Sequence, residues 1–213
     1  MAVDVKICGL RDPVALAAAV DGGARFVGFV FFPPSPRYVE ASQVARLARG
    51  VPEGVDKVGL VVDAEDDAIG AILNRAPLDM LQLHGSETPA RVREVRARFR
   101  LPVIKVIDVA SALDLTRAHT YEDVADRILF DARAPAGADR PGGNAQPFDW
   151  GLLAGRTWRL PWLLAGGLTA ESLAEAVRVT GAGALDVSSG VEDRPGVKNP
   201  EKIRDFLAAA QRL

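Results

Sequence analysis

The sequence contains one cysteine and two histidines, and this scarcity narrows the chemistry open to the chain. A single thiol, Cys8, forms no disulfide within the chain, and His84 and His119 lie too far apart in sequence to show a metal-ligand spacing. No apolar run reaches the roughly 18 residues of a membrane span, and charges interrupt the amino-terminal apolar stretch, unlike a signal peptide. We therefore expect a cytoplasmic protein without a metal centre.

Neither sign of charge dominates the chain. Twenty-six Lys and Arg residues balance 28 Asp and Glu residues, for a net charge of −2, and no cluster of basic residues forms the stripe that a nucleic acid or an anionic membrane would require. Nucleic acids and anionic membranes bind to basic patches, so we expect neither as a partner. With 213 residues, of which 48% are hydrophobic, the chain can bury one sizeable core. We expect one domain over residues 1–213.

Short apolar runs alternate with alanine- and arginine-rich segments of helical period along the whole chain. Eight runs are predicted strands, each followed by a helix-like segment: VDVKIC, RFVGFVF, DKVGLVV, DMLQLH, PVIKVI, DRILFD, PWLLAG and ALDVSS. Asp12, Thr169 and Asn199 are the expected helix caps. The pattern predicts an α/β fold, a (β/α)8 TIM barrel with eight parallel strands. A doubly wound open sheet is the alternative, disfavoured because no GxGxxG follows the first strand.

One segment breaks the alternation. Residues 132–148 are rich in proline, glycine and alanine, and complete strand and helix units lie on both sides of them. Long loops inside compact domains usually serve function, so we expect an active-site loop there rather than a linker.

Two strand ends carry candidate catalytic groups. Because side chains alternate along a strand, Asp4, Lys6 and Cys8 share one face, which we expect to point into the barrel with Cys8 at its carboxyl-terminal mouth. Cys8 is either a buried small hydrophobic residue or a reactive thiol. Asp131 ends the sixth strand as a helix cap or as a general acid with a pKa raised by burial. A base and an acid on the first and sixth strands would face each other across the mouth.

The remaining candidates would line or close the same mouth. Gln82 and His84 end the fourth strand; a lone histidine there is more often a hydrogen-bonded structural residue than a catalyst, so we interpret His84 as lining the site. Arg37 follows the second strand, as a surface residue or as a bidentate partner for a carboxylate. Glycines and serines after the last two strands suit a phosphate, because they allow close backbone approach. These phosphate-binding candidates are Gly166, Gly167, Ser188, Ser189 and Gly190.

Several segments resemble the phosphoribosylanthranilate isomerase family of tryptophan biosynthesis, in the family's order. They are KICGL, GFVFFPPSPRYV, LQLHG, LFDA, the later GG and FDW, GGL, and DVSSGVE, and they extend from Val5 to about Gly196. The resemblance implies a (β/α)8 barrel that converts N-(5-phosphoribosyl)anthranilate into 1-(2-carboxyphenylamino)-1-deoxyribulose 5-phosphate by an Amadori rearrangement, without cofactor or metal. It implies that Cys8 is the general base and Asp131 the general acid, that Arg37 holds the anthranilate carboxylate, and that the loops after strands seven and eight hold the phosphate.

The chemistry leaves open how Cys8 becomes a thiolate. A free thiol with a pKa of ~8.5 is only a few per cent ionised at neutral pH, so we expect Lys6, two residues below it, to supply a positive charge. Asp4 or Asp186 could instead neutralise Lys6, and we group Lys6 and Asp186 with the substrate-binding residues. Two positions depart from the family pattern, Arg133 where lysine is common and Ala145 where glycine is common.

Two other functions are consistent with parts of the pattern. A histidine-pathway isomerase would need two phosphate sites and a pair of aspartates, and a non-catalytic barrel that binds a sugar phosphate would not need Cys8 opposite Asp131. Both are disfavoured. For the oligomeric state we expect a monomer, with a homodimer as the alternative.

Overall fold

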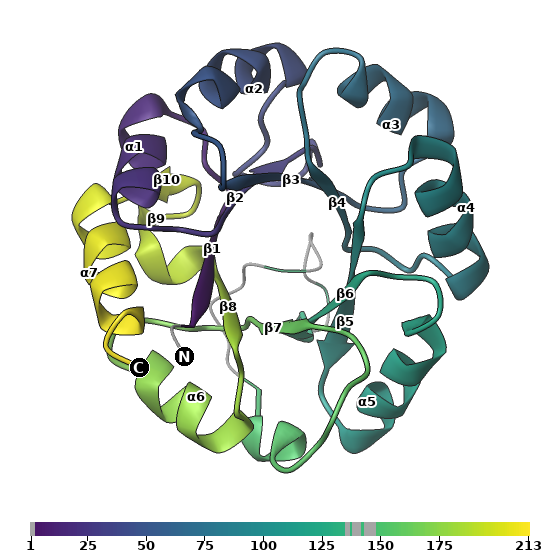
Figure 1. Ribbon diagram of the computed structural model, residues 1–213, viewed down its shortest axis with the longest axis vertical. Helices are drawn as coiled ribbons and strands as arrows, with labels where there is room; N and C mark the ends of the chain where they lie inside the picture. Colours follow the sequence, from purple (N-terminus) through teal and green to yellow (C-terminus); the bar gives the residue numbers. More distant parts are fainter. Residues whose placement is uncertain (1–2, 135–136, 138–141, 143–147) are drawn as a thin grey trace.

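Eight parallel strands form a closed barrel surrounded by helices (Figure 1). The structure is a computed structural model and describes residues 3–134, 137, 142 and 148–213. The barrel strands are β1 (Asp4–Cys8), β2 (Phe26–Val30), β3 (Asp56–Val61), β4 (Met80–Leu83), β5 (Val103–Val109), β6 (Arg127–Ala132), β7 (Trp162–Leu164) and β8 (Ala184–Val187).

The α-helices of the described residues follow the strands in order. They are α1 (Pro13–Asp21), α2 (Ala41–Leu47), α3 (Asp66–Leu73), α4 (Pro89–Phe99), α5 (Ala112–Ala118), α6 (Leu173–Thr180) and α7 (Pro200–Ala210). Short 3-10 helices are η1 (Ala48–Gly50), η2 (His119–Tyr121), η3 (Trp150–Leu153) and η4 (Ser189–Val191). A hairpin of β9 (Glu192–Arg194) and β10 (Val197–Lys198) lies between η4 and α7.

The first strand closes the barrel. It pairs in parallel with both β2 and β8, so that Lys6 lies opposite Phe26 on one side and Asp186 on the other. This register confirms the barrel and excludes the open sheet. It also brings the two ends of the chain together, since residues 180 positions apart become neighbours.

Alternation along the strands separates two apolar cores. One packs between the strands and the helices and contains Val5 and Ile7 of β1. The other fills the barrel interior and contains Phe26, Val58 and Leu129. As expected of a small barrel, its interior is packed with side chains, so a cavity for a ligand can form only at an end.

Two of the three predicted helix caps are confirmed. The side chain of Asp12 accepts a hydrogen bond from Ala15 N, and that of Asn199 accepts from Glu201 N. The Thr169 prediction is wrong, because α6 begins four residues later at Leu173. Thr169 forms a turn instead, in which its N–H donates to Ser172 Oγ. This side-chain bond competes with the start of a helix.

The sixth unit also differs from the prediction of a helix after every strand. In its described part only the 3-10 helix η3 follows β6. Gly151 lies within η3 and Gly155, in the left-handed region at φ +69°, follows it, and glycine disfavours a longer helix. Most of the predicted loop over 132–148 lies outside the described residues, although Ala132 itself belongs to β6.

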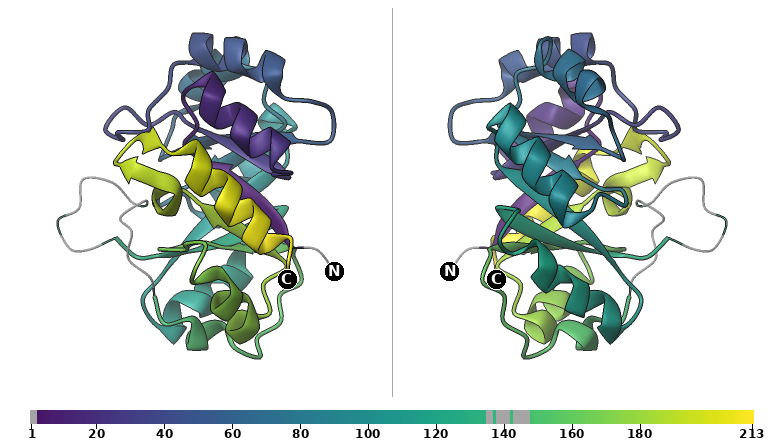
Figure 2. Two further views of the ribbon diagram at one scale, coloured as in Figure 1. Left: turned by 90° about the vertical axis from the view of Figure 1, so that its left-hand side faces the viewer. Right: turned by 90° about the vertical axis from the view of Figure 1, so that its right-hand side faces the viewer.

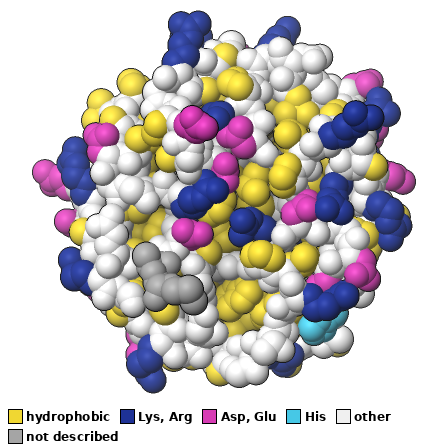
Figure 3. Space-filling model, viewed as in Figure 1, with side chains coloured by type: hydrophobic (Ala, Val, Ile, Leu, Met, Phe, Trp, Pro, Cys, Tyr) yellow, Lys and Arg dark blue, Asp and Glu magenta, His cyan; other side chains and the backbone are white. Residues whose placement is uncertain are grey.

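The end of the chain and the β9–β10 hairpin lie at opposite ends of the barrel. The chain ends, after α7, at the amino ends of the strands, whereas the β9–β10 hairpin lies at the opposite end (Figure 2). The face at the amino ends carries interspersed acidic and basic side chains around apolar ones (Figure 3). Among the described residues, no helix is both long and apolar enough to cross a bilayer.

Candidate active site

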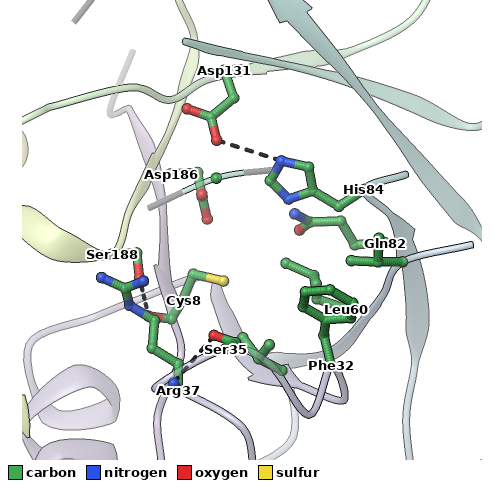
Figure 4. Close-up of a pocket in the computed structure, with 13 residues that line it drawn as sticks. Cys8, Phe32, Ser35, Arg37, Leu60, Gln82, His84, Asp131, Asp186 and Ser188 are labelled. Carbon is green, nitrogen blue, oxygen red and sulfur yellow. Dashed lines mark hydrogen bonds and ion pairs between the residues drawn. The ribbon is translucent and has the colours of Figure 1, made fainter. Parts of the chain in front are cut away.

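A pocket opens at the carboxyl ends of the strands and contains the candidate catalytic groups (Figure 4). The space within it, counted together with the open solvent at its mouth, is about 450 Å³. Cys8 from β1 and Asp131 from β6 point into it from different sides, as strand alternation predicts. The lining consists of Cys8, Val30, Phe32, Ser35, Arg37, Leu60, Val62, Gln82, His84, Asp131, Gly142, Asp186 and Ser188.

Lys6 and Asp186 form a buried ion pair beside the thiol. Lys6 Nζ donates to Asp186 Oδ1 at 2.7 Å. Lys6 is fully buried and does not line the pocket, whereas Cys8 and Asp186 do. Burial alone would lower the pKa of Lys6, but Asp186 and Cys8 outweigh it and raise the pKa. Burial raises the pKa of the Cys8 thiol, and Lys6 acts in the opposite direction. Lys6 therefore lowers the pKa of the thiol, as expected, and it is also paired with Asp186, which was the alternative.

Gly28 of β2 makes room for this cluster. A Cβ atom at Gly28 would lie 3.0 Å from Lys6 Nζ and 3.1 Å from Cys8 Sγ. The lysine and the thiol therefore lie over a glycine that no larger residue can replace without displacing them.

Asp131 keeps its proton up to near neutral pH. Burial, followed by the charges of Asp186 and Asp108, raises its pKa to about 7. Ala132 N donates to its Oδ1 at 2.8 Å, which leaves Oδ2 directed toward His84, whose Nε2 lies 3.6 Å away. His84 is neutral, because burial and the charges of Lys105 and Lys6 lower its pKa to about 3.

Arg37 lines the pocket and already binds a carboxylate of the chain. Its Nε and Nη2 donate to the two carboxylate oxygens of Glu192 at 2.8 Å each. Lys198 Nζ donates to Glu192 Oε1 at 2.9 Å and to Ser188 O at 2.8 Å. Burial lowers the pKa of Lys198 to about 8 despite this carboxylate. Cationic side chains thus gather at the β8 side of the pocket.

The loops after β7 and β8 come together as predicted. Gly166 and Gly167 both have positive φ, at +87° and +66°. A Cβ atom at Gly190 would lie 1.9 Å from Leu168 O, so the two loops are in backbone contact there. Ser189 begins η4, and Ser188 lines the pocket while its hydroxyl donates to Cys8 O at 3.1 Å. One predicted phosphate ligand is thus already engaged within the protein.

Sequence reasoning missed four charged residues around the site. Asp108 ends β5 next to Asp131 in the sheet register, and burial raises its pKa to about 6. The same strand-end alternation that indicated Asp131 could have indicated it. Glu192, Lys198 and Lys105 carry no comparable strand-end signal. Glu192 binds Arg37, which lies 155 residues away, and Lys105 binds Glu87, which lies 18 residues away, whereas Lys198 pairs with Glu192 within the β9–β10 hairpin.

Of the two departures from the family pattern, Arg133 belongs to the described residues and Ala145 does not. Arg133 forms an ion pair with Asp114, which belongs to the capping box at the start of α5 and accepts hydrogen bonds from the backbone N–H groups of Ala110 and Ser111. The start of the loop after β6 is therefore tied to α5. Ala145 lies outside the described residues.

A buried thiol and a carboxyl group with a raised pKa at the mouth of a parallel barrel are typical of an enzyme of the (β/α)8 class. Comparison with known proteins identifies it further. The family model of N-(5'-phosphoribosyl)anthranilate isomerase matches residues 5–209. The chain belongs to this family.

Individual relatives support this. The N-(5'-phosphoribosyl)anthranilate isomerase of Paracoccus denitrificans is 59% identical over 210 residues, covering 99% of this chain and 98% of that protein. The solved isomerase of Thermotoga maritima superposes with a TM-score of 0.89 at 35% identity, covering 99% of this chain and all of that one. A solved isomerase in complex with reduced 1-(o-carboxyphenylamino)-1-deoxyribulose 5-phosphate is 34% identical, with a TM-score of 0.85, and covers 99% of this chain and all of that one.

The chain is accordingly an aldose-ketose isomerase of tryptophan biosynthesis. Its reaction converts N-(5-phosphoribosyl)anthranilate to the corresponding aminoketose by an Amadori rearrangement. The isomerase predicted from the sequence is confirmed.

Proposed function

We propose that Cys8 and Asp131 perform the acid and base steps of this rearrangement. The observation that carries the proposal is that the two groups point into one pocket from β1 and β6 (Figure 4). Opening the ribose ring requires a proton on the ring oxygen, and Asp131 supplies it because its pKa of about 7 leaves about half of the carboxyl groups protonated at neutral pH. The iminium ion that results makes the proton on C2 of the sugar acidic, and the Cys8 thiolate removes it.

The thiolate is a minor form before substrate binds. Because burial raises the pKa of Cys8, the ionised fraction at neutral pH is small, and Lys6 opposes this effect from the same face of β1. Lys6 is therefore a positioning residue, which acts on substrate through the thiol. Its ion pair with Asp186 weakens that help, since the carboxylate raises the pKa of the thiol.

The two anionic ends of the substrate have separate places in this proposal. Arg37 receives the anthranilate carboxylate, in a cluster where Glu192 and Lys198 fix its position. The backbone around Gly166, Gly167 and residues 188–190 receives the phosphate, since positive φ and the absence of side chains allow close approach. The relative solved with the reduced product analogue supports a phosphoribosyl ligand for this pocket.

A turnover assay on purified protein tests these roles. Phosphoribosylanthranilate generated in situ should be consumed, seen as loss of its fluorescence. Cys8→Ala and Asp131→Asn should each lose at least ~10²-fold in turnover. The matched control is Val14→Ala, which alters an exposed side chain on α1 and should leave turnover unchanged. Normal turnover in both site variants would contradict the assignment.

We also propose that the chain acts as one domain over residues 1–213 and as a monomer in the cytoplasm. The large exposed apolar side chains of the described residues are scattered over different elements, on α1, α5, β10 and the chain end, which favours a monomer. A phosphorylated substrate does not cross a bilayer unaided, which supports the compartment. Light scattering after size exclusion tests the monomer, and a mass of twice 22.7 kDa would show a homodimer instead.

A further inference from the structure

Two buried polar atoms, one on β4 and one on the residue that follows it, have no hydrogen-bond partner among the described residues. They are Gln82 Oε1 and His84 Nε2, and both residues line the pocket. Folded proteins leave few buried polar atoms unsatisfied, because each one has given up its hydrogen bonds to water without gaining another. Two such atoms, two residues apart on one strand face, indicate that a ligand completes them.

The imidazole of His84 does not pair with the acids near it. Its Nε2 lies 3.6 Å from Asp131 Oδ2 and 3.8 Å from Asp108 Oδ1, beyond hydrogen-bond distance. Lys105 Nζ donates to Gly85 O at 2.7 Å and to Leu83 O at 3.3 Å, the carbonyls on either side of His84. The ammonium group disfavours a second positive charge there, so the neutral ring offers a hydrogen bond rather than an ion pair.

Gln82 narrows the chemistry of the missing partner. It is 1% exposed, and its amide oxygen can only accept a hydrogen bond. The partner must therefore bring an O–H or N–H group. A carboxylate or an ionised phosphate cannot serve, which excludes both anionic ends of the substrate.

The walls of the pocket differ in polarity. Val30, Phe32, Leu60 and Val62, from β2 and β3 and the residues that follow them, make one wall apolar. Gln82, His84, Asp131 and Asp186 make the other wall polar, as Figure 4 shows for the labelled residues. An aromatic ring suits the first wall, and a chain of hydroxyl groups suits the second.

We propose that Gln82 and His84 form the site that recognises the sugar hydroxyl groups of the substrate, and that they determine its specificity for a hydroxylated sugar chain. The inference rests on the proposed function and adds to it. Cys8 and Asp131 move protons, whereas the β4 pair selects and holds the carbon chain between them. A substrate that lacks the matching hydroxyl would leave a buried oxygen or nitrogen unpaired, which is the stronger form of discrimination.

Calorimetric titration with two kinds of ligand tests the proposal. The first is the reduced product analogue, and the others are derivatives of it that each lack one sugar hydroxyl. The wild-type chain should bind at least one deoxy derivative about 10- to 100-fold more weakly than the parent. The quantity compared is the Kd of a deoxy derivative divided by the Kd of the parent. Gln82→Met and His84→Phe should each bring this ratio, for one derivative, to within about threefold of unity, because the parent loses the hydrogen bond that the derivative lacks.

Val62→Ala provides the matched control on the apolar wall. It should weaken parent and derivatives by the same factor and leave every ratio unchanged. Gln82→Met should also unfold at a temperature no lower than wild type, since it removes a buried amide that has no partner.

The hydroxyl site would be overturned if the Kd ratios of derivative to parent in both Gln82→Met and His84→Phe equalled those of wild type. A clear loss of stability in unliganded Gln82→Met would overturn it as well. If the wild-type chain turns over substrate and binds the parent analogue, that result leaves the proposed function standing. Failure of the wild type to bind the parent at all would overturn both.

Discussion

Replacing Asp131 by asparagine should remove catalysis and stabilise the protein, with a stabilisation that grows as the pH rises from about 4 to 7. Burial, together with Asp186 and Asp108, raises the pKa of this carboxyl from 3.8 to about 7. This difference corresponds to about 4 kcal/mol of preference for the neutral acid in the folded state. Because relaxation and water reduce the cost of buried charge, we expect about 2–4 kcal/mol in practice.

The sign follows from proton linkage. Below about pH 4 the acid is protonated in both folded and unfolded chains, and the group contributes no penalty. Between about pH 4 and 7 the unfolded chain releases the proton and the folded chain keeps it, so the free energy of unfolding falls as pH rises. Above pH 7 the whole penalty is present. Asparagine does not ionise, so the variant escapes it.

Urea unfolding of wild type and Asp131→Asn at about pH 4.5 and 8.5 measures this effect. The variant should be more stable by about 2–4 kcal/mol at the higher pH and close to wild type at the lower. Asp205→Asn is the matched control, because Asp205 is exposed on α7 and its replacement should shift stability little and equally at both pH values. A difference between Asp131→Asn and wild type that does not grow with pH would refute the buried, protonated acid.

Three further predictions concern the thiol, its glycine neighbour and a helix cap. Lys6→Met should move the alkylation of Cys8 by iodoacetamide to higher pH, because it removes the charge that lowers the thiol pKa; an unchanged pH profile would contradict this role. Gly28→Ala should lower turnover by displacing the lysine and the thiol, whereas Gly183→Ala, which has open space, should not. Asn199→Ala should lower the free energy of unfolding by about 1 kcal/mol in urea without changing turnover, and no loss of stability would show that the cap is dispensable.

Burial has opposite consequences for the proposed base, Cys8, and the proposed acid, Asp131. Burial raises the pKa of the thiol and of Asp131 together, which favours the protonated acid and disfavours the thiolate base. Lys6 is close enough to act on both groups, since its charge lowers both pKa values. Burial and the charge of Lys6 therefore act in opposite directions on the protonation of both Cys8 and Asp131 in the unliganded site.

The limits of sequence reasoning are clearest at Arg37 and Thr169. The loop position of Arg37 at the mouth followed from the strand before it, but its bond to Glu192, 155 residues away, did not. Thr169 has the residue type of a helix cap, yet its side chain and that of Ser172 satisfy local backbone groups in a turn, so the helix starts later. The preference of a residue type for the helix cap is only a tendency, and competing local hydrogen bonds decide at which residue the helix starts.

By itself the sequence determined the barrel and the placement of Cys8 and Asp131 at its mouth. Strand and helix periods, and the alternation of side chains along a strand, are set by a few neighbouring residues and can be read without contacts. Only the tertiary structure decided the pairing of Lys6 with Asp186, the neutral state of His84 and the raised pKa of Asp131. Burial and charge act through space, and closing the barrel sets charged groups from opposite ends of the chain side by side.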